Sequence, residues 1–129
     1  MLVDAANVVG ARPDGWWRDR AGAAARLVGR LQLLDGAALP DSGPYAGEPL
    51  GAVVIVLEGA ARPGVGQGLV GTVDVRHAPG SGDDALVTLA APRTVLVTAD
   101  RELARRARER GAHVAGPRWL LDWLDGLSG

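Results

Sequence analysis

Hydrophobic residues occur along this chain in short runs that glycine, proline and polar residues separate. Some of the runs are rich in β-branched residues and nearly continuous, which is typical of strands buried on both faces of a sheet. The strands predicted in this way cover residues 1–4, 52–57, 69–76 and 93–98, with a fifth, short strand at 113–115.

Other segments repeat their apolar residues at helical spacing. The positions of Trp17, Ala24, Val28 and Leu31 predict an amphipathic helix over residues 16–34. Three further helices are expected, at 83–90, at 100–110 and from Pro117 onward.

The remaining stretches carry turn residues without periodicity, so we expect loops at 5–15, 35–51 and 59–68. Gly111 suits the C-terminal cap of the helix before it, and Pro117 suits the first position of the helix it opens. Alternating strands and helices predict an α/β fold with a mainly parallel sheet of four or five strands. No internal repeat or boundary is visible, so a single domain over residues 1–129 is expected.

Acidic residues stand where predicted strands give way to loops or helices. They are Asp4, Glu58, the pair Asp83 and Asp84, and Asp100. The carboxyl ends of parallel strands line one crevice, so we expect these side chains to converge. Clustered carboxylates repel one another unless a cation neutralises them or some stay protonated. The sequence therefore predicts a site for Mg²⁺ or Mn²⁺, which prefer carboxylate and water oxygens.

Each acid also has a purely structural explanation. Asp4 can cap the turn that follows it, and Glu58 can be a solvated loop residue. Ser81 and Asp84 have the spacing of a capping box, and Asp100 can cap its own helix. Capping does not require every strand to end in an acid, so both interpretations stay open.

The composition restricts the function only weakly. The net charge is −1, and all 14 basic residues are arginine. If the five acids act as a metal site, the rest of the surface carries a small positive charge, which neither supports nor excludes nucleic acid. The absence of cysteine excludes disulfides and thiolate metal sites. The sequence has no long apolar run and no leader-like start, so we expect a cytoplasmic protein with no membrane partner.

Three motifs in order resemble those of the NYN branch of the PIN-like nucleases. They are V-D-A-A-N at 3–7, S-G-D-D-A-L at 81–86 and V-T-A-D-R-E-L at 97–103. In that family the first strand ends in D-x-x-N, a middle helix begins with a motif such as A-D-D-x-I, and the fourth strand ends in T-x-D. The resemblance covers residues 2–111.

This resemblance implies a compact, Rossmann-like α/β/α fold around a Mg²⁺ or Mn²⁺ site that hydrolyses RNA. It implies that Asp4, Asp83 and Asp100 bind metal, with the neighbouring Asp84 as a further candidate. Glu58 matches the acidic residue after the second strand and is expected to act as a ligand or a base. Asp4 and Asp100 are expected to bind metal directly.

The same resemblance implies supporting polar roles for Asn7 and Thr98. The chain departs from the family pattern at Gly82, where alanine is usual, and it shows no obvious RNA-binding extension.

Several residues near the predicted site remain open between a functional and an ordinary role. Arg12, Arg62 and Arg101 are expected at the same edge of the sheet, where each can contact a substrate phosphate or simply be solvated. The adjacent residues Trp16 and Trp17 can pack in the protein or stack on a base.

RNA is the expected partner of this chain. A different function also fits the sequence, namely a non-catalytic PIN-like module that binds RNA or a protein partner. The sequence also leaves a homodimer open. The segment 116–123 locally resembles the last helix of BRCT interaction domains, but that resemblance leaves the acids unexplained.

Overall fold

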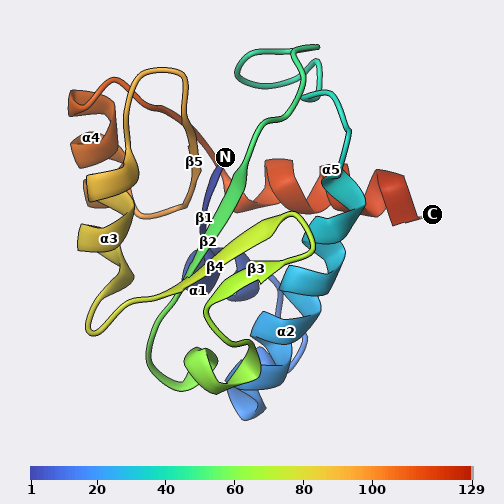
Figure 1. Ribbon diagram of the computed structural model, residues 1–129, viewed down its shortest axis with the longest axis vertical. Helices are drawn as coiled ribbons and strands as arrows, with labels where there is room; N and C mark the ends of the chain where they lie inside the picture. The colour runs from blue at the N-terminus through green and yellow to red at the C-terminus, as the bar shows by residue number, and fades with distance from the viewer. Residues whose placement is uncertain (129) are drawn as a thin grey trace.

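The computed structural model describes residues 1–128 and shows strands alternating with helices along the chain (Figure 1). In chain order the elements are β1 (Leu2–Asp4), α1 (Ala5–Val9), η1 (Trp16–Arg18), α2 (Arg20–Leu31), η2 (Gln32–Leu34), β2 (Val53–Leu57), η3 (Gly59–Gly64), β3 (Gly68–Val70), β4 (Val73–His77), α3 (Gly82–Leu89), β5 (Val95–Val97), α4 (Arg101–Glu109), β6 (His113–Ala115) and α5 (Pro117–Ser128). The η elements are short 3₁₀ turns.

The strands form one sheet in the order β3-β4-β2-β1-β5-β6. All neighbouring pairs in the described part of the chain are parallel except β3 and β4, which run antiparallel. In Figure 1, α3 and α4 lie on one side of the sheet and α2 and α5 on the other. The protein therefore has a Rossmann-like three-layer α/β/α architecture with a mainly parallel sheet.

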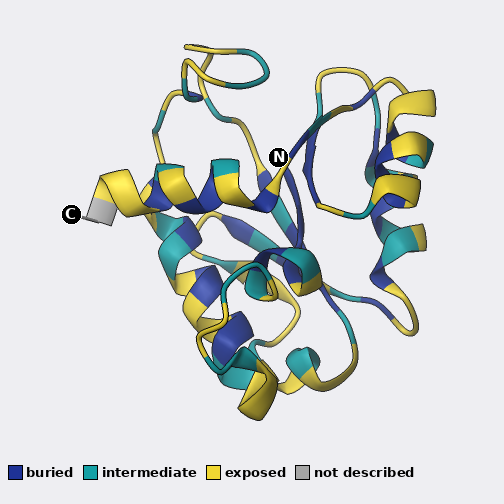
Figure 2. Cartoon of the chain, turned by 180° about the vertical axis from the view of Figure 1, so that it is seen from behind, coloured by how far each residue is buried: buried dark blue, intermediate teal, exposed yellow. Residues whose placement is uncertain are grey.

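Two hydrophobic cores lie on opposite faces of the sheet, because successive strand residues point to opposite sides. Val3 and Ile55 pack with α1, α2 and α5 in the larger core. Leu2 and Val56 pack with α3 and α4 in the smaller one. Figure 2 shows the central strands and the inner sides of the helices as the buried parts of the molecule. The strand ends, and the side chains that follow them, are thus held in fixed positions.

The structure corrects three of the predicted elements. The loop expected at 5–15 begins with the helix α1, and the helix expected at 16–34 is regular only from Arg20 to Leu31. The single strand expected at 69–76 is the hairpin of β3 and β4, which turns at Gly71 with a φ of 60°. This extra strand is why the sheet has six strands instead of four or five.

No helix within residues 1–128 combines the length and the apolar character needed to cross a bilayer.

Candidate functional site

Asp4 is a buried carboxylate at the point where β1 passes into α1. The residue is only 7% exposed. Asp4 Oδ2 accepts hydrogen bonds from Asn7 Nδ2 at 2.7 Å and from Thr98 Oγ1 at 2.8 Å. Burial raises the pKa of Asp4, these hydrogen bonds oppose the shift, and repulsion from Asp83 adds to it.

Thr98 links the end of β1 to the end of β5. Its hydroxyl donates to Asp4 and accepts from the backbone N–H of Asp100 at 3.1 Å. Asp100 caps α4, because its Oδ1 accepts from the N–H of Leu103 at 3.0 Å. Asn7 completes the link, since its Oδ1 accepts from the N–H of Ala99. These contacts hold Asp4 and Asp100 side by side from two neighbouring strands.

Glu58 follows β2 and lies against the first residue of α3. Its Oε2 accepts a short hydrogen bond from the N–H of Gly82. A Cβ at position 82 would lie 3.2 Å from Glu58 Oε2 and 3.4 Å from a methyl group of Val56. The glycine thus allows the carboxylate to come close to the helix, which gives a structural reason for the departure from alanine at this position.

Asp83 lies in the first turn of α3 and faces the other acids. Its pKa is raised, first by burial and then by repulsion from Asp100 and Glu58, while Arg106 partly opposes the shift. No hydrogen bond to its carboxylate is found within residues 1–128. The structure therefore brings together four acids, Asp4, Glu58, Asp83 and Asp100, which we call the acidic site.

Asp84 does not belong to the acidic site, contrary to the metal-binding role expected of it. Its side chain is 85% exposed and pairs with Arg106 of α4 at 2.9 Å. Consecutive helix residues point about 100° apart, so only one residue of the acidic pair faces the strand ends. Ser81 caps the helix through the N–H of Asp83.

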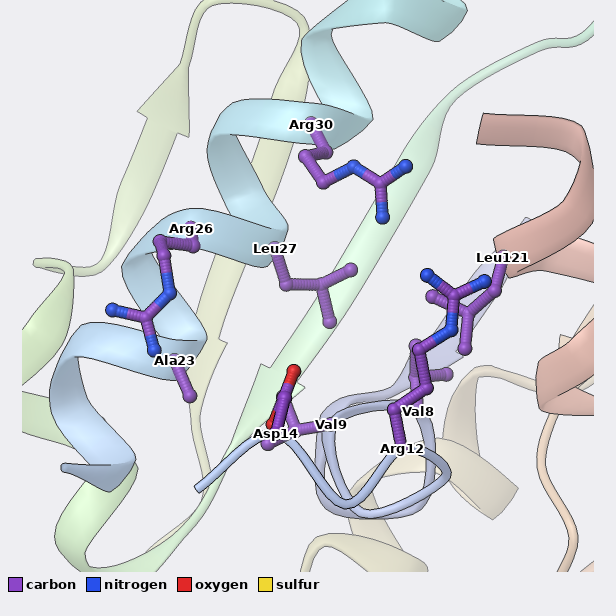
Figure 3. Close-up of a pocket in the computed structure, with 9 residues that line it drawn as sticks. All are labelled: Val8, Val9, Arg12, Asp14, Ala23, Arg26, Leu27, Arg30 and Leu121. Atoms are coloured by element: carbon purple, nitrogen blue, oxygen red, sulfur yellow. The ribbon is translucent and has the colours of Figure 1, made fainter. Parts of the chain in front are cut away.

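Arg12 turns toward α5 instead of toward the acidic site. Its guanidinium pairs with Asp125 at 2.6 Å, and Arg30 pairs with the same carboxylate at 2.7 Å. Arg12, Arg26 and Arg30 line a pocket of about 210 Å³ between α1 and α2, with an apolar floor (Figure 3). In Figure 3, Arg26 extends along α2 toward Ala23, away from Arg30.

Arg62 and Arg101 lie on the same edge of the sheet as the acids. Arg62 donates to the carbonyl of Ala78, in the segment between β4 and α3, at 3.5 Å. Arg101 is exposed and lines an open hollow of about 430 Å³ together with Asp100 and Arg108. Arg101 thus lies beside Asp100 where α4 begins, and Arg62 lies in η3, after β2.

Arg106, like Arg108, lies near the site and is not among the candidates that the sequence indicates. It lies in a helix in which basic and acidic residues are interspersed, a pattern typical of a solvent-exposed face. In the structure its side chain extends to α3, where it pairs with Asp84. Its charge partly opposes the rise in the pKa of Asp83. No signal in the sequence identifies this contact, because it depends on the packing of α3 against α4.

The donor set of the acidic site suits a hard divalent cation. The oxygens Asp83 Oδ1 and Oδ2, Glu58 Oε1 and Asp100 Oδ2 accept no hydrogen bond from described residues. Across residues 1–128, however, no three Asp, Glu or His side chains lie close enough together to hold one ion. This spacing is compatible with Mg²⁺, which usually keeps several waters and takes one or two carboxylates plus substrate phosphates.

Comparison with solved structures finds the same fold in Rae1 (YacP) from Bacillus subtilis. Its crystal structure matches with a TM-score of 0.72 and 20% sequence identity, over 98% of this chain and 74% of that one. A point mutant of the same protein matches with a TM-score of 0.70 at 20% identity, over 98% and 75% of the two chains. At this identity the likeness shows the fold alone. No family model matches the chain, and no curated protein matches it.

Proposed function

We propose that this protein is a metal-dependent ribonuclease of the NYN/PIN-like class, which hydrolyses RNA at the acidic site. One observation carries the proposal. Carboxylates from separate segments of the chain meet at one edge of the sheet, and the pKa of Asp83 is raised by burial first and then by repulsion from Asp100 and Glu58. Such like-charge crowding is unfavourable for folding and is typical of functional sites. The three motifs at 3–7, 81–86 and 97–103 support the same class.

Asp4, Asp83, Asp100 and Glu58 would hold Mg²⁺ or Mn²⁺ in this proposal. When bound, the ion would supply an activated water and stabilise the charge on the leaving oxygen. The protein contributes the positions of the oxygens. Thr98 and Asn7 fix the Asp4 carboxylate.

Glu58 is suited to accept a proton. The N–H of Gly82 fixes one of its oxygens, and no described residue donates to the other. Arg101, the first residue of α4, and Arg108, in its last turn, line the open hollow next to Asp100 and are candidates to contact substrate phosphates.

The test is cleavage of single-stranded RNA by the purified protein in Mn²⁺ or Mg²⁺. We expect cleavage that EDTA abolishes and that Asp4→Asn and Asp100→Asn each reduce by at least about 100-fold. Asp84→Asn is the matched control and is expected to cleave at close to the wild-type rate, because this carboxylate points away from the site. Unchanged cleavage by Asp4→Asn and Asp100→Asn would remove these residues from the mechanism.

A non-catalytic module that binds RNA is the second candidate. The observation in its favour is the spacing of the acids, since no three of them in the described chain approach one ion. It predicts RNA binding that EDTA does not change, with no hydrolysis of any RNA tested.

A further inference from the structure

A small pocket opens beside Glu58, on the side of the acidic site where α1 and α2 meet. Its volume is about 70 Å³. It is lined by Trp16 and Arg20 and by small side chains, among them those of Ala24 and Ala61. We call this the Trp16 pocket. It shares Glu58 with the acidic site, so a ligand in the pocket lies next to the carboxylates.

The Trp16 ring is held in place at the rim of this pocket. The Trp17 ring meets it edge-on, with the centroids 6.0 Å apart and the planes at 88°. The Arg20 guanidinium lies 5.3 Å from the Trp16 centroid, which is a cation–π contact. Trp16 remains partly exposed, so a fixed aromatic surface with a positive charge beside it faces the solvent.

Arginines continue along α2 from this pocket, with Asp14 as the acidic residue in the lining of the pocket of Figure 3. Arg20 and Arg26 make no ion pair with any residue of the described chain, whereas Asp125 holds both Arg12 and Arg30. Val9 lines both the Trp16 pocket and the arginine-lined pocket of Figure 3, so the two hollows adjoin. An anionic polymer leaving the acidic site along this side would meet an aromatic ring and then unpaired arginines.

We propose that the Trp16 pocket takes a base of single-stranded RNA, next to the phosphate at the acidic site. This inference rests on the proposed function, since it makes the pocket a subsite for the same substrate. Trp16 stacks on the base, and Arg20 and Arg26 contact the backbone that follows it. Stacking on an aromatic ring is open to every base, so the pocket selects for a single strand and not for a sequence.

The experiment measures binding of a short labelled single-stranded RNA by fluorescence anisotropy, in EDTA and on an Asp83→Asn background. These conditions stop metal-dependent cleavage and remove one repelling carboxylate. We expect Trp16→Ala to weaken binding by about tenfold and Trp16→Phe by less than about threefold, because phenylalanine keeps an aromatic face. A duplex of the same sequence should bind with equal affinity to Trp16→Ala and to its parent, the Asp83→Asn protein with Trp16 intact.

Two further variants test whether weaker binding by Trp16→Ala reflects loss of the contact with RNA or loss of the folded structure. Ala61→Leu adds bulk to the lining of the pocket without changing Trp16 and should also weaken binding. Arg20→Ala should weaken binding and make it less dependent on salt, because one phosphate contact is lost. The charge control is Arg93→Ala, which removes an exposed arginine before β5, at the opposite edge of the sheet.

Equal RNA affinity of Trp16→Ala, Ala61→Leu and the parent overturns the inference, as does a parent that binds no single-stranded RNA. Failure of the proposed nuclease function gives a different result from failure of the RNA-base subsite. If the wild-type protein binds RNA through Trp16 but never cleaves it in Mn²⁺, the subsite stands and the nuclease assignment fails. If it cleaves through Asp4 and Asp100 while Trp16→Ala binds normally, the nuclease assignment stands and the subsite fails.

Discussion

The carboxylates of Asp4 and Asp83 share one site but differ in how the protein stabilises them. Asp4 is deeply buried and accepts hydrogen bonds from Asn7 and Thr98. Asp83 is less buried, accepts no hydrogen bond from described residues, and is repelled by Asp100 and Glu58. Single substitutions at these residues should therefore change stability in opposite directions, depending on whether they remove repulsion or a hydrogen bond.

Asp83→Asn should make the protein more stable in EDTA at neutral pH. The substitution removes repulsion without removing a hydrogen bond, so we expect a gain of about 1 kcal/mol, seen as a rise of a few degrees in Tm. Asp84→Asn is the control, and since Asp84 is exposed and paired with Arg106 it should give no gain. An equal gain in both variants would mean that crowding at the acidic site is not the cause.

The gain from Asp83→Asn should depend on pH in a defined direction. The pKa of Asp83 is raised from 3.8 in the folded protein, so between 3.8 and its raised pKa the folded state binds more protons than the unfolded state. The contribution of Asp83 to stability is thus full below pH 3.8 and is lost as the pH rises through the raised pKa. Urea denaturation should give the wild-type protein and Asp83→Asn the same free energy of unfolding below pH 3.8. Above the raised pKa of Asp83, the variant should have the larger free energy of unfolding.

Thr98→Val should act in the opposite sense, because it removes the hydroxyl that donates to the buried Asp4 carboxylate. A hydrogen bond to a charged group contributes about 1.5–3 kcal/mol, so a loss of stability of that order is expected by chemical denaturation at neutral pH. Thr98→Ser keeps the hydroxyl and should restore most of the loss. A loss of the same size in the serine variant would point to packing of the methyl group instead.

At the scale of elements, the strands and most helices follow from local sequence, and the exceptions have identifiable causes. Asp4 and Asn7 are turn-forming residues, but here Asp4 caps a helix of only five residues, which is too short to show periodicity. Gly71 divides an otherwise continuous β pattern into two strands, because its positive φ makes the turn of a hairpin.

Two glycines in or next to helices should respond differently to alanine. Gly111 follows α4 with a φ of 91°, and a Cβ there would lie 3.0 Å from Pro92 Cγ. Gly29 lies inside α2, with open space around its Cβ position. We expect Gly111→Ala to cost roughly 1–2 kcal/mol and Gly29→Ala to add about 0.5–1 kcal/mol in thermal or urea unfolding. Equal effects at the two positions would contradict the assigned backbone conformations.

At the scale of the whole molecule, the sequence could predict the α/β fold and the meeting of the acids, because parallel topology brings strand ends to one edge. It could not predict which way exposed side chains turn. Asp84 and Arg12 have suitable residue types and nearby positions in the chain, yet they pair with Arg106 and Asp125. Those pairings depend on how helices pack on one another, which local sequence patterns do not encode.

The central claim is that the acidic site is built for a divalent cation, and isothermal titration of Mn²⁺ tests it most directly. The wild-type protein and Asp84→Asn should each show one or two saturable sites. Asp83→Asn and Asp4→Asn should bind at least about tenfold more weakly, because each removes an oxygen ligand or its charge. Absence of a site in the wild-type protein, or equal Mn²⁺ affinity in all four proteins, would contradict the account.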